Sequence, residues 1–128
     1  MWFRRNKPPE DPKALGRWGE KQARAFLEKQ GLACVECNFT CQSGEIDLIM
    51  TQSDKTLVFV EVKTRTSETH SSVESAITLA KKQRMTRAAR YYAGIHRLTD
   101  RPLRFDVITI SVSTPGDIRH YPNAWVPA

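Results

Sequence analysis

Three charged side chains in the middle of the chain have the types and spacing of a site for phosphodiester chemistry. Asp47 stands in one apolar segment, and Glu61 and Lys63 stand in the next. Hard divalent ions such as Mg²⁺ take oxygen ligands, usually one or two carboxylates together with waters and a substrate phosphate. A lysine two residues beyond one of the carboxylates could orient an attacking water or help to deprotonate it. The set therefore predicts metal-assisted hydrolysis of a phosphate ester.

The two segments are typical of β-strands joined by a polar turn at residues 51–55. Because side chains alternate between the faces of a strand, the charged residues of each strand are expected on one face. Those faces are Glu45, Asp47 and Ile49 in the first strand, and Leu57, Phe59, Glu61 and Lys63 in the second. The opposite faces are Ile46, Leu48 and Met50, and Val58, Val60 and Val62. A charge in a buried strand is costly unless it is paired or binds a metal, so the pattern needs a specific cause.

A simpler interpretation of the same residues stays open. Glu61 and Lys63 could form an ordinary ion pair on a half-exposed sheet, and Glu-x-Lys triplets are common. The presence of Asp47 upstream, with apolar residues around both segments, favours the site.

Asp47 followed by Glu61-Val62-Lys63 resembles the Asp…Glu-x-Lys signature of the restriction-endonuclease-like nucleases. Further motifs accompany it: Gly16…Gly19-Glu20, Gly44-Glu45-Ile46-Asp47-Leu48-Ile49, Phe59-Val60-Glu61-Val62-Lys63, Lys82-Gln83 and Arg104-Phe105-Asp106-Val107. Together they resemble the YraN family, small bacterial proteins that are predicted endonucleases distantly similar to archaeal Holliday junction resolvases. The resemblance covers residues 15–125.

This resemblance implies roles for two residues on helices. Glu20 would assist the metal site from the first helix, and Gln83 would support it from a later helix. By spacing alone, Glu20 could equally be a boundary residue paired with Arg24, four positions later.

We expect Asp47 and Glu61 to bind Mg²⁺ or Mn²⁺ through oxygen. The carbonyl of Val62 is expected to join them, with Glu20 acting through a water.

Two helices are expected to frame the strands. The first begins at Asp11-Pro12, an N-cap followed by proline at the first helical position, and ends before Gly31. The second is expected to begin with Ser72 as its cap and to end near Ile95. Apolar residues at helical spacing mark one side of each.

Basic residues on and before the second helix are candidates for contact with nucleic acid. Arg87 and Arg90 follow Gln83 at helical spacing, Arg84 adjoins them, and Arg65 lies just after the Glu61 strand. The formal net charge of +6 favours a polyanionic partner. We expect these four arginines to contact DNA, while a solvated basic face would give the same pattern.

The three cysteines raise a different possibility. Residues 32–39 are typical of a strand carrying Cys34 and Cys37, with Cys41 just beyond. A Cys-x-x-Cys pair suggests the possibility of a zinc site or an iron–sulfur cluster. Residues three apart in a strand point to opposite faces, and the histidines are scattered, so we expect structural cysteines. Their odd number indicates a reducing cytoplasm.

The remainder of the chain completes the sheet. Leu103–Val112 is expected to be a strand, residues 117–121 a short last strand, and Trp125 to pack back on the body. Asp106 could be a fourth carboxylate of the site, but a salt bridge or a turn-edge position is the preferred interpretation.

The element order is then helix, three strands, helix, strand. Short connections predict an antiparallel meander, and the long helix returns a strand parallel to the third. This is an α/β fold, the αβββαβ core of the restriction-endonuclease-like proteins, with a mixed sheet flanked by helices. Residues 1–12 are expected to be a flexible basic tail and residues 13–128 a single nuclease-like domain.

Two functions fit these patterns. One is a Mg²⁺-dependent endonuclease for DNA phosphodiester bonds, with branched or single-stranded forms and recombination or repair intermediates as candidate substrates. The other is a nucleic-acid-binding or assembly protein that keeps the fold and does not cleave. The complete set of Asp47, Glu61 and Lys63 favours the first. We expect a cytoplasmic protein without a membrane segment; RNA binding and a homodimer stay open.

Overall fold

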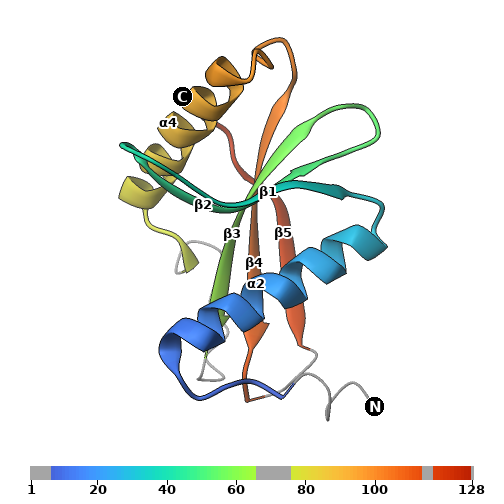
Figure 1. Cartoon of the computed structure of the whole chain (residues 1–128), viewed down its shortest axis with the longest axis vertical. Helices are drawn as coiled ribbons and strands as arrows, with labels where there is room; N and C mark the ends of the chain where they lie inside the picture. Colours follow the sequence, from blue (N-terminus) through green and yellow to red (C-terminus); the bar gives the residue numbers. More distant parts are fainter. Residues whose placement is uncertain (1–6, 66–75, 114–116, 128) are drawn as a thin grey trace.

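A computed structural model describes residues 7–65, 76–113 and 117–127. Its elements are α2 (Pro12–Lys29), β1 (Ala33–Cys41), β2 (Gly44–Thr51), β3 (Leu57–Arg65), α4 (Leu79–Ile95), β4 (Leu103–Ser111) and β5 (Ile118–Trp125). The strands form one sheet in the order β1-β2-β3-β4-β5. The β3–β4 pair is parallel and the other three pairs are antiparallel. Figure 1 shows α2 crossing the lower half of the sheet and α4 running beside its upper half. The predicted α/β class and the αβββαβ order are confirmed.

The first helix begins and ends as the sequence predicts. The side chain of Asp11 accepts a hydrogen bond from the backbone N–H of Ala14 at 3.0 Å, and Pro12 occupies the first helical position. Gly31 follows the helix with φ +96°, a left-handed conformation that glycine adopts without strain. In the middle of the helix, Gly19 lies so close to β3 that a β-carbon would collide with Thr64. The absence of a side chain at Gly19 thus brings the neighbouring turn of α2 against the sheet.

Helix α4 begins later than predicted. Thr78 has an extended backbone (φ −79°, ψ 162°), and its hydroxyl accepts the N–H of Lys81 at 3.2 Å. An unbroken helix from Ser72 is therefore wrong, although Ser72 itself lies outside the described residues. Threonine hydroxyls compete with the helical backbone for donors, so Thr78 acts as a cap. The predicted end at Ile95 is confirmed.

The two faces of the sheet pack against different helices. Leu57 and Phe59 of β3 pack with α4, whereas Val58 and Val60 pack with α2, as the alternation predicts. Leu48 and Met50 of β2 lie on the α2 side and Ile49 on the α4 side, also as predicted.

Ile46 is the exception to the predicted alternation. It packs on the α4 side, opposite Phe39 of β1, rather than with Leu48. Asn38 of β1 lies between the Cys37–Leu48 and Phe39–Ile46 pairs and has a positive φ of 54°. The pairing of β2 with β3 also ends at Leu48. Regular alternation requires an unbroken pleat, and here the pleat is interrupted.

The last strand is longer than predicted, since β5 continues to Trp125. The indole of Trp125 stacks on Phe105 with ring centroids 4.8 Å apart, which confirms that Trp125 packs back on the body. Neither helix in the described ranges combines the length and apolar character that crossing a membrane requires.

Candidate active site

The two carboxylates of the predicted site meet where β2 separates from β3. The ladder between these strands runs from Thr51–Leu57 to Leu48–Val60 and stops there. The next positions in the same register are Asp47 and Glu61. Instead of a backbone bond, the Asp47 carboxylate accepts the N–H of Val62 at 2.8 Å. A side chain thus replaces a ladder bond and holds Asp47 beside Glu61.

Glu61 is buried and touches two lysines. Its side chain is 4% exposed, and its carboxylate lies 3.5 Å from Lys63 Nζ and 3.7 Å from Lys81 Nζ. Burial, followed by the charge of Asp47, raises the pKa of Glu61 to about 7, although both lysines act in the opposite direction. Burial also raises the pKa of Asp47, against the Val62 N–H and a hydrogen bond with Glu61. Because the two carboxylates are close together and largely removed from water, ionising both costs more than ionising two separate groups.

A third carboxylate reaches the pair from the other side of the sheet. Glu20 lies one residue after Gly19 on α2, and burial together with the charge of Asp47 raises its pKa. The Glu20 side chain also hydrogen-bonds Asn38 and Asp47. The alternative partner for Glu20, Arg24, pairs with Glu28 at 3.2 Å instead. Carboxylates from the sheet (Asp47 and Glu61) and from α2 (Glu20) thus meet where β2 separates from β3.

The donor set fits a hard divalent cation. Two carboxylates in hydrogen-bond contact, each with a raised pKa, form a site in which a cation can replace the shared proton. No group of three His, Cys, Asp or Glu side chains within the described ranges is arranged to hold a metal by itself. Mg²⁺ usually takes only one or two carboxylates from a protein. The N–H and C=O of a strand residue point to the same edge, so the Val62 carbonyl faces the Asp47 side as well.

A polar hollow of about 570 Å³ adjoins the pair on the α4 side. It is lined by Lys63, Arg65, Ala76, Ile77, Thr78, Lys81 and Arg84. Four of these are basic, and the described lining contains no acidic residue. Lys63 and Lys81 belong both to this lining and to the ion pairs of Glu61. A phosphate group in the hollow would therefore lie next to the carboxylates.

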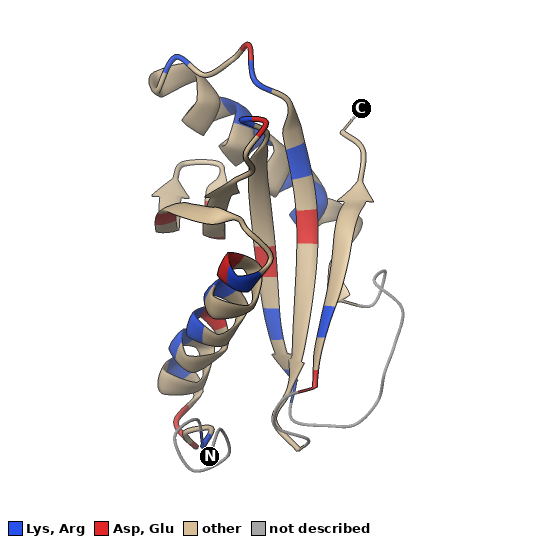
Figure 2. Ribbon diagram, turned by 90° about the vertical axis from the view of Figure 1, so that its right-hand side faces the viewer, with Lys and Arg blue, Asp and Glu red and all other residues tan. Residues whose placement is uncertain are grey.

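The structure divides the four arginines that are expected to contact DNA between two surfaces. Arg84 and Arg65 line the hollow beside Lys63, as a role in substrate contact requires. Arg87, Arg90 and Gln83 line a separate groove beside the end of β5. The supporting role of Gln83 stays a prediction, and its side chain is not part of the hollow. In Figure 2, basic positions follow α4, whereas α2 and the central strands carry both acidic and basic bands.

Asp106 forms a second, separate carboxylate centre on β4. It is fully buried and accepts hydrogen bonds from Nε and Nη2 of Arg104 at 2.9 and 2.8 Å and from the N–H of Asn123 at 3.0 Å. His120 Nε2 lies 2.7 Å away. Burial alone would raise the pKa of Asp106, but the contacts with His120, Arg104 and Asn123 outweigh it and lower the pKa. The preferred interpretation of a salt bridge is confirmed.

Two residues that shape the site are not among those predicted from the sequence. Lys81 bridges α4 to Glu61, and Asn38 supports Glu20 from a left-handed position in β1. An asparagine inside a strand pattern is a weak signal for such a conformation, because asparagine tolerates positive φ. Lys81 carries no comparable signal, since its direction depends on where α4 begins.

The cysteines contradict one step of the sequence argument. Cys34 and Cys37 do not point apart: their Sγ atoms lie 3.5 Å from each other. A register shift between Cys34 and Glu36 inserts an extra residue in β1, which resets the alternation. Both cysteines and Cys41 are free thiols, and burial raises the pKa of Cys34 to about 11.

Comparison with known proteins gives a consistent family. The model of the uncharacterised protein family UPF0102 matches residues 19–110. A UPF0102 protein of Alkalilimnicola ehrlichii is 43% identical over 118 residues, 91% of this chain and 93% of its own. One from Nitrosomonas europaea is 43% identical over 110 residues, 86% and 92% of the two chains. Another, from Clostridium perfringens, is 41% identical over 99 residues, 77% and 80%. These names state no activity.

Proposed function

The chain belongs to the UPF0102 family, also called the YraN family, and from this premise we propose that it is a metal-dependent endonuclease for DNA phosphodiester bonds. One observation carries the proposal. The buried Glu61 and the partly buried Asp47, both with raised pKa values, lie beside a hollow lined by four basic residues, of which Lys63 and Lys81 contact Glu61. A protein that only bound DNA would gain nothing from buried carboxylates beside the phosphate, because they repel it.

The basic hollow supplies the substrate contacts. Lys63, Arg65, Lys81 and Arg84 come from two elements, the end of β3 and the first turns of α4. Cations from two sides can hold one phosphate group and fix its direction relative to the carboxylates. Such positioning is a large part of catalysis in phosphoryl transfer.

Asp47, Glu61 and the carbonyl of Val62 are the groups that would hold Mg²⁺ or Mn²⁺. When bound there, such an ion lowers the pKa of a water and neutralises charge on the phosphate. Glu20, hydrogen-bonded to Asn38, would act on the same centre through a water. Asp47 is held in place by the Val62 N–H, which fixes its direction before any ligand arrives.

Lys63 and Lys81 have different tasks in this proposal. The side chain of Lys63 is 45% exposed and reaches from Glu61 into the hollow, where its ammonium group can donate to a water and to a phosphate oxygen. Lys81 is less exposed and joins α4 to Glu61. We assign Lys63 to orienting the water and stabilising the charge that develops on the phosphate, and Lys81 to positioning Glu61.

The test is cleavage of linear, nicked, flapped and four-way DNA with Mg²⁺ or Mn²⁺, and with chelator. We expect metal-dependent cleavage that is lost in Asp47→Asn and Glu61→Gln. Calorimetric titration with Mn²⁺ should show weaker binding in both variants than in the unaltered protein. Equal Mn²⁺ affinity in all three proteins would exclude the metal site. DNA binding without cleavage of any substrate would instead favour the non-catalytic binding protein.

A further inference from the structure

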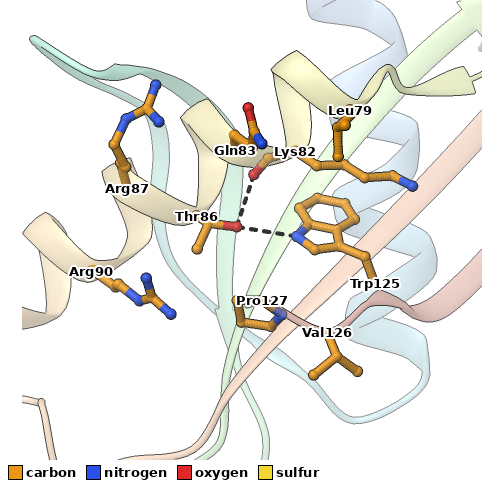
Figure 3. Close-up of a pocket in the computed structure, with 9 residues that line it drawn as sticks. All are labelled: Leu79, Lys82, Gln83, Thr86, Arg87, Arg90, Trp125, Val126 and Pro127. Atoms are coloured by element: carbon orange, nitrogen blue, oxygen red, sulfur yellow. Dashed lines mark hydrogen bonds between the residues drawn. The ribbon is translucent and has the colours of Figure 1, made fainter.

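A second basic surface lies beside α4, next to the end of β5. It is a groove of about 470 Å³, lined by Leu79, Lys82, Gln83, Thr86, Arg87, Arg90, Trp125, Val126 and Pro127 (Figure 3). Three of these residues are basic, and the described lining contains no acidic residue. The sign of the charge therefore selects an anionic occupant.

One wall of the groove is apolar, and part of it is strongly exposed. Leu79 is 70% exposed and Val126 is 78% exposed, at opposite sides of Trp125 in Figure 3. Neither side chain gains stability from burial in the folded chain. Apolar side chains gathered beside cations in a groove are typical of a binding surface.

The indole in this wall is held in a fixed orientation. Trp125 Nε1 donates to the Thr86 hydroxyl at 3.2 Å, and that hydroxyl donates to the Lys82 carbonyl at 2.8 Å (Figure 3). One side of the indole ring stacks on Phe105. A ligand that packs against this wall meets a surface that is already ordered, so little side-chain entropy is lost on binding.

We propose that the groove binds an unpaired stretch of nucleic acid, with a base against the apolar wall and the adjoining phosphates on Lys82, Arg87 and Arg90. Duplex DNA presents phosphates, and its stacked bases cannot reach such a wall. An unpaired strand exposes the faces of its bases, which pack on aromatic and aliphatic side chains while the backbone follows cations. The combination of an apolar wall and basic residues thus selects a single strand over a duplex.

The position of α4 links the groove to the carboxylate centre. Lys81 and Arg84 face the hollow, whereas the adjoining Lys82 and Arg87 face the groove. Only the width of one helix, about 10–12 Å with side chains, separates the two surfaces. Resting on the proposed function, the inference is that the nuclease substrate includes unpaired nucleotides, which α4 holds apart from the strand at the carboxylates.

The first experiment measures binding in chelator, so that it does not depend on cleavage. The probes are oligothymidylate of about ten nucleotides, within the usual site size for single strands, and a duplex of equal length. Val126→Glu places a negative charge at an exposed position, and Arg87→Ala removes an exposed cation. We expect each to weaken binding of oligothymidylate about tenfold while duplex binding changes less than twofold. Lys29→Ala, which removes a cation at the end of α2, is the matched control and should leave both unchanged.

A second experiment locates the strand directly. Oligothymidylate carrying 5-iodouracil is photo-crosslinked to the protein, which is then digested with trypsin. We expect the crosslink in the fragment 120–128, which contains Trp125, and its loss in Val126→Glu. Crosslinks confined to other fragments, or unchanged oligothymidylate binding in both groove variants, would overturn the proposal. Displacement of the strand by oligoglutamate at similar concentration would also overturn it, since the groove would then select only negative charge.

These results separate this inference from the proposed function. If the protein cleaves DNA with metal and the groove variants still bind oligothymidylate normally, the proposal for the groove is wrong and the proposed nuclease function stands. If the groove variants lose oligothymidylate binding but the protein never cleaves, the proposed nuclease function is wrong and the binding groove stands.

Discussion

The sheet carries two buried carboxylate centres on neighbouring strands, and they differ in how their charge is balanced. Asp106 on β4 is surrounded by donors from Arg104, His120 and Asn123, and its pKa is lowered. Glu61 on β3 also touches two basic side chains, yet its pKa is raised to about 7. Hydrogen bonds from three residues outweigh the burial of Asp106, whereas Glu61 is buried beside a second carboxylate, Asp47, and its two lysines do not outweigh both effects.

The two centres differ in whether the charge of the carboxyl groups is compensated by their neighbours. The Asp106 centre is complete within the chain, so its charge stabilises the fold. At the other centre, three carboxyl groups, those of Asp47, Glu61 and Glu20, lie with two lysines within the described residues, so full ionisation would leave one negative charge there without a partner cation. Like charges that are close together and partly buried destabilise the folded state, and this is the arrangement on which the proposed cation site rests.

The largest expected effect separates the two centres by stability. Asp106→Asn leaves Arg104 without its carboxylate inside the protein, and we expect a loss of about 3–5 kcal/mol in the free energy of unfolding. Asp47→Asn removes repulsion as well as a hydrogen bond, so its unfolding free energy should change by less than about 1 kcal/mol. Urea denaturation of both variants in chelator measures this. A large loss in Asp47→Asn with none in Asp106→Asn would reverse the comparison.

The next effect concerns activity. Lys63→Ala should lower single-turnover cleavage by roughly 10²–10³-fold, because it removes a donor aimed at charge that develops in the transition state. The melting temperature and DNA binding should change little, since Lys63 is half exposed and an exposed ion pair contributes about 0–1 kcal/mol. Lys29→Ala serves as the control. Cleavage at the original rate in Lys63→Ala would leave this lysine as only an ion-pair partner of Glu61.

The two centres should also differ in their pH dependence. A carboxyl group with a raised pKa holds its proton more tightly in the folded state, so stability falls as pH rises from about 4.5 to about 7 for Glu61. Asp106, with a lowered pKa, contributes stability above about 3.8 and loses it only as pH falls further. In chelator, unfolding free energy should therefore decrease by on the order of 2 kcal/mol between pH 5 and pH 7.5.

Glu61→Gln is the test of that assignment. Its loss of stability over the same pH interval should be clearly smaller than in the unaltered protein. Equal losses in both proteins would assign the pH dependence to other groups.

The smallest expected effect is on the salt dependence of DNA binding, measured for one arginine near each centre. Arg84 lines the hollow beside Glu61, whereas Arg119 of β5 is next to His120 and pairs with Asp117. For duplex DNA, Arg84→Ala should reduce the salt slope of log affinity by roughly 0.9, the value for one phosphate contact. Arg119→Ala should leave the slope unchanged. If both variants show the same salt slope of log affinity, Arg84 contacts DNA no more specifically than Arg119 does.

Several features followed from the sequence alone, because their causes are local. Asp11 and Pro12 start α2 through cap chemistry, and the alternation in β3 places Glu61 on the α4 side of the sheet. The order of elements and their short connections determined the topology, since few right-handed arrangements remain. The types and spacing of Asp47, Glu61 and Lys63 predict metal-assisted hydrolysis, and this chemistry stays a prediction.

Other features depended on tertiary packing. The separation of β2 from β3 before Leu48 accompanies the change in the side on which Ile46 lies, and a register shift in β1 brings Cys34 to Cys37. Neither break in alternation can be read from periodicity, because a strand shows its period only while its pairing is regular.

The division of the α4 basic residues has the same origin. The spacing of Arg84, Arg87 and Arg90 places them on a helix surface, but not against any particular neighbour. Only packing on the sheet decides that Arg84 lines the hollow with Lys63 and Lys81, while Arg87 and Arg90 line the groove with Trp125. Sequence determined which residues could carry the chemistry, and tertiary structure decided which of them act together, because the direction of a helix face is set by contacts distant in the chain.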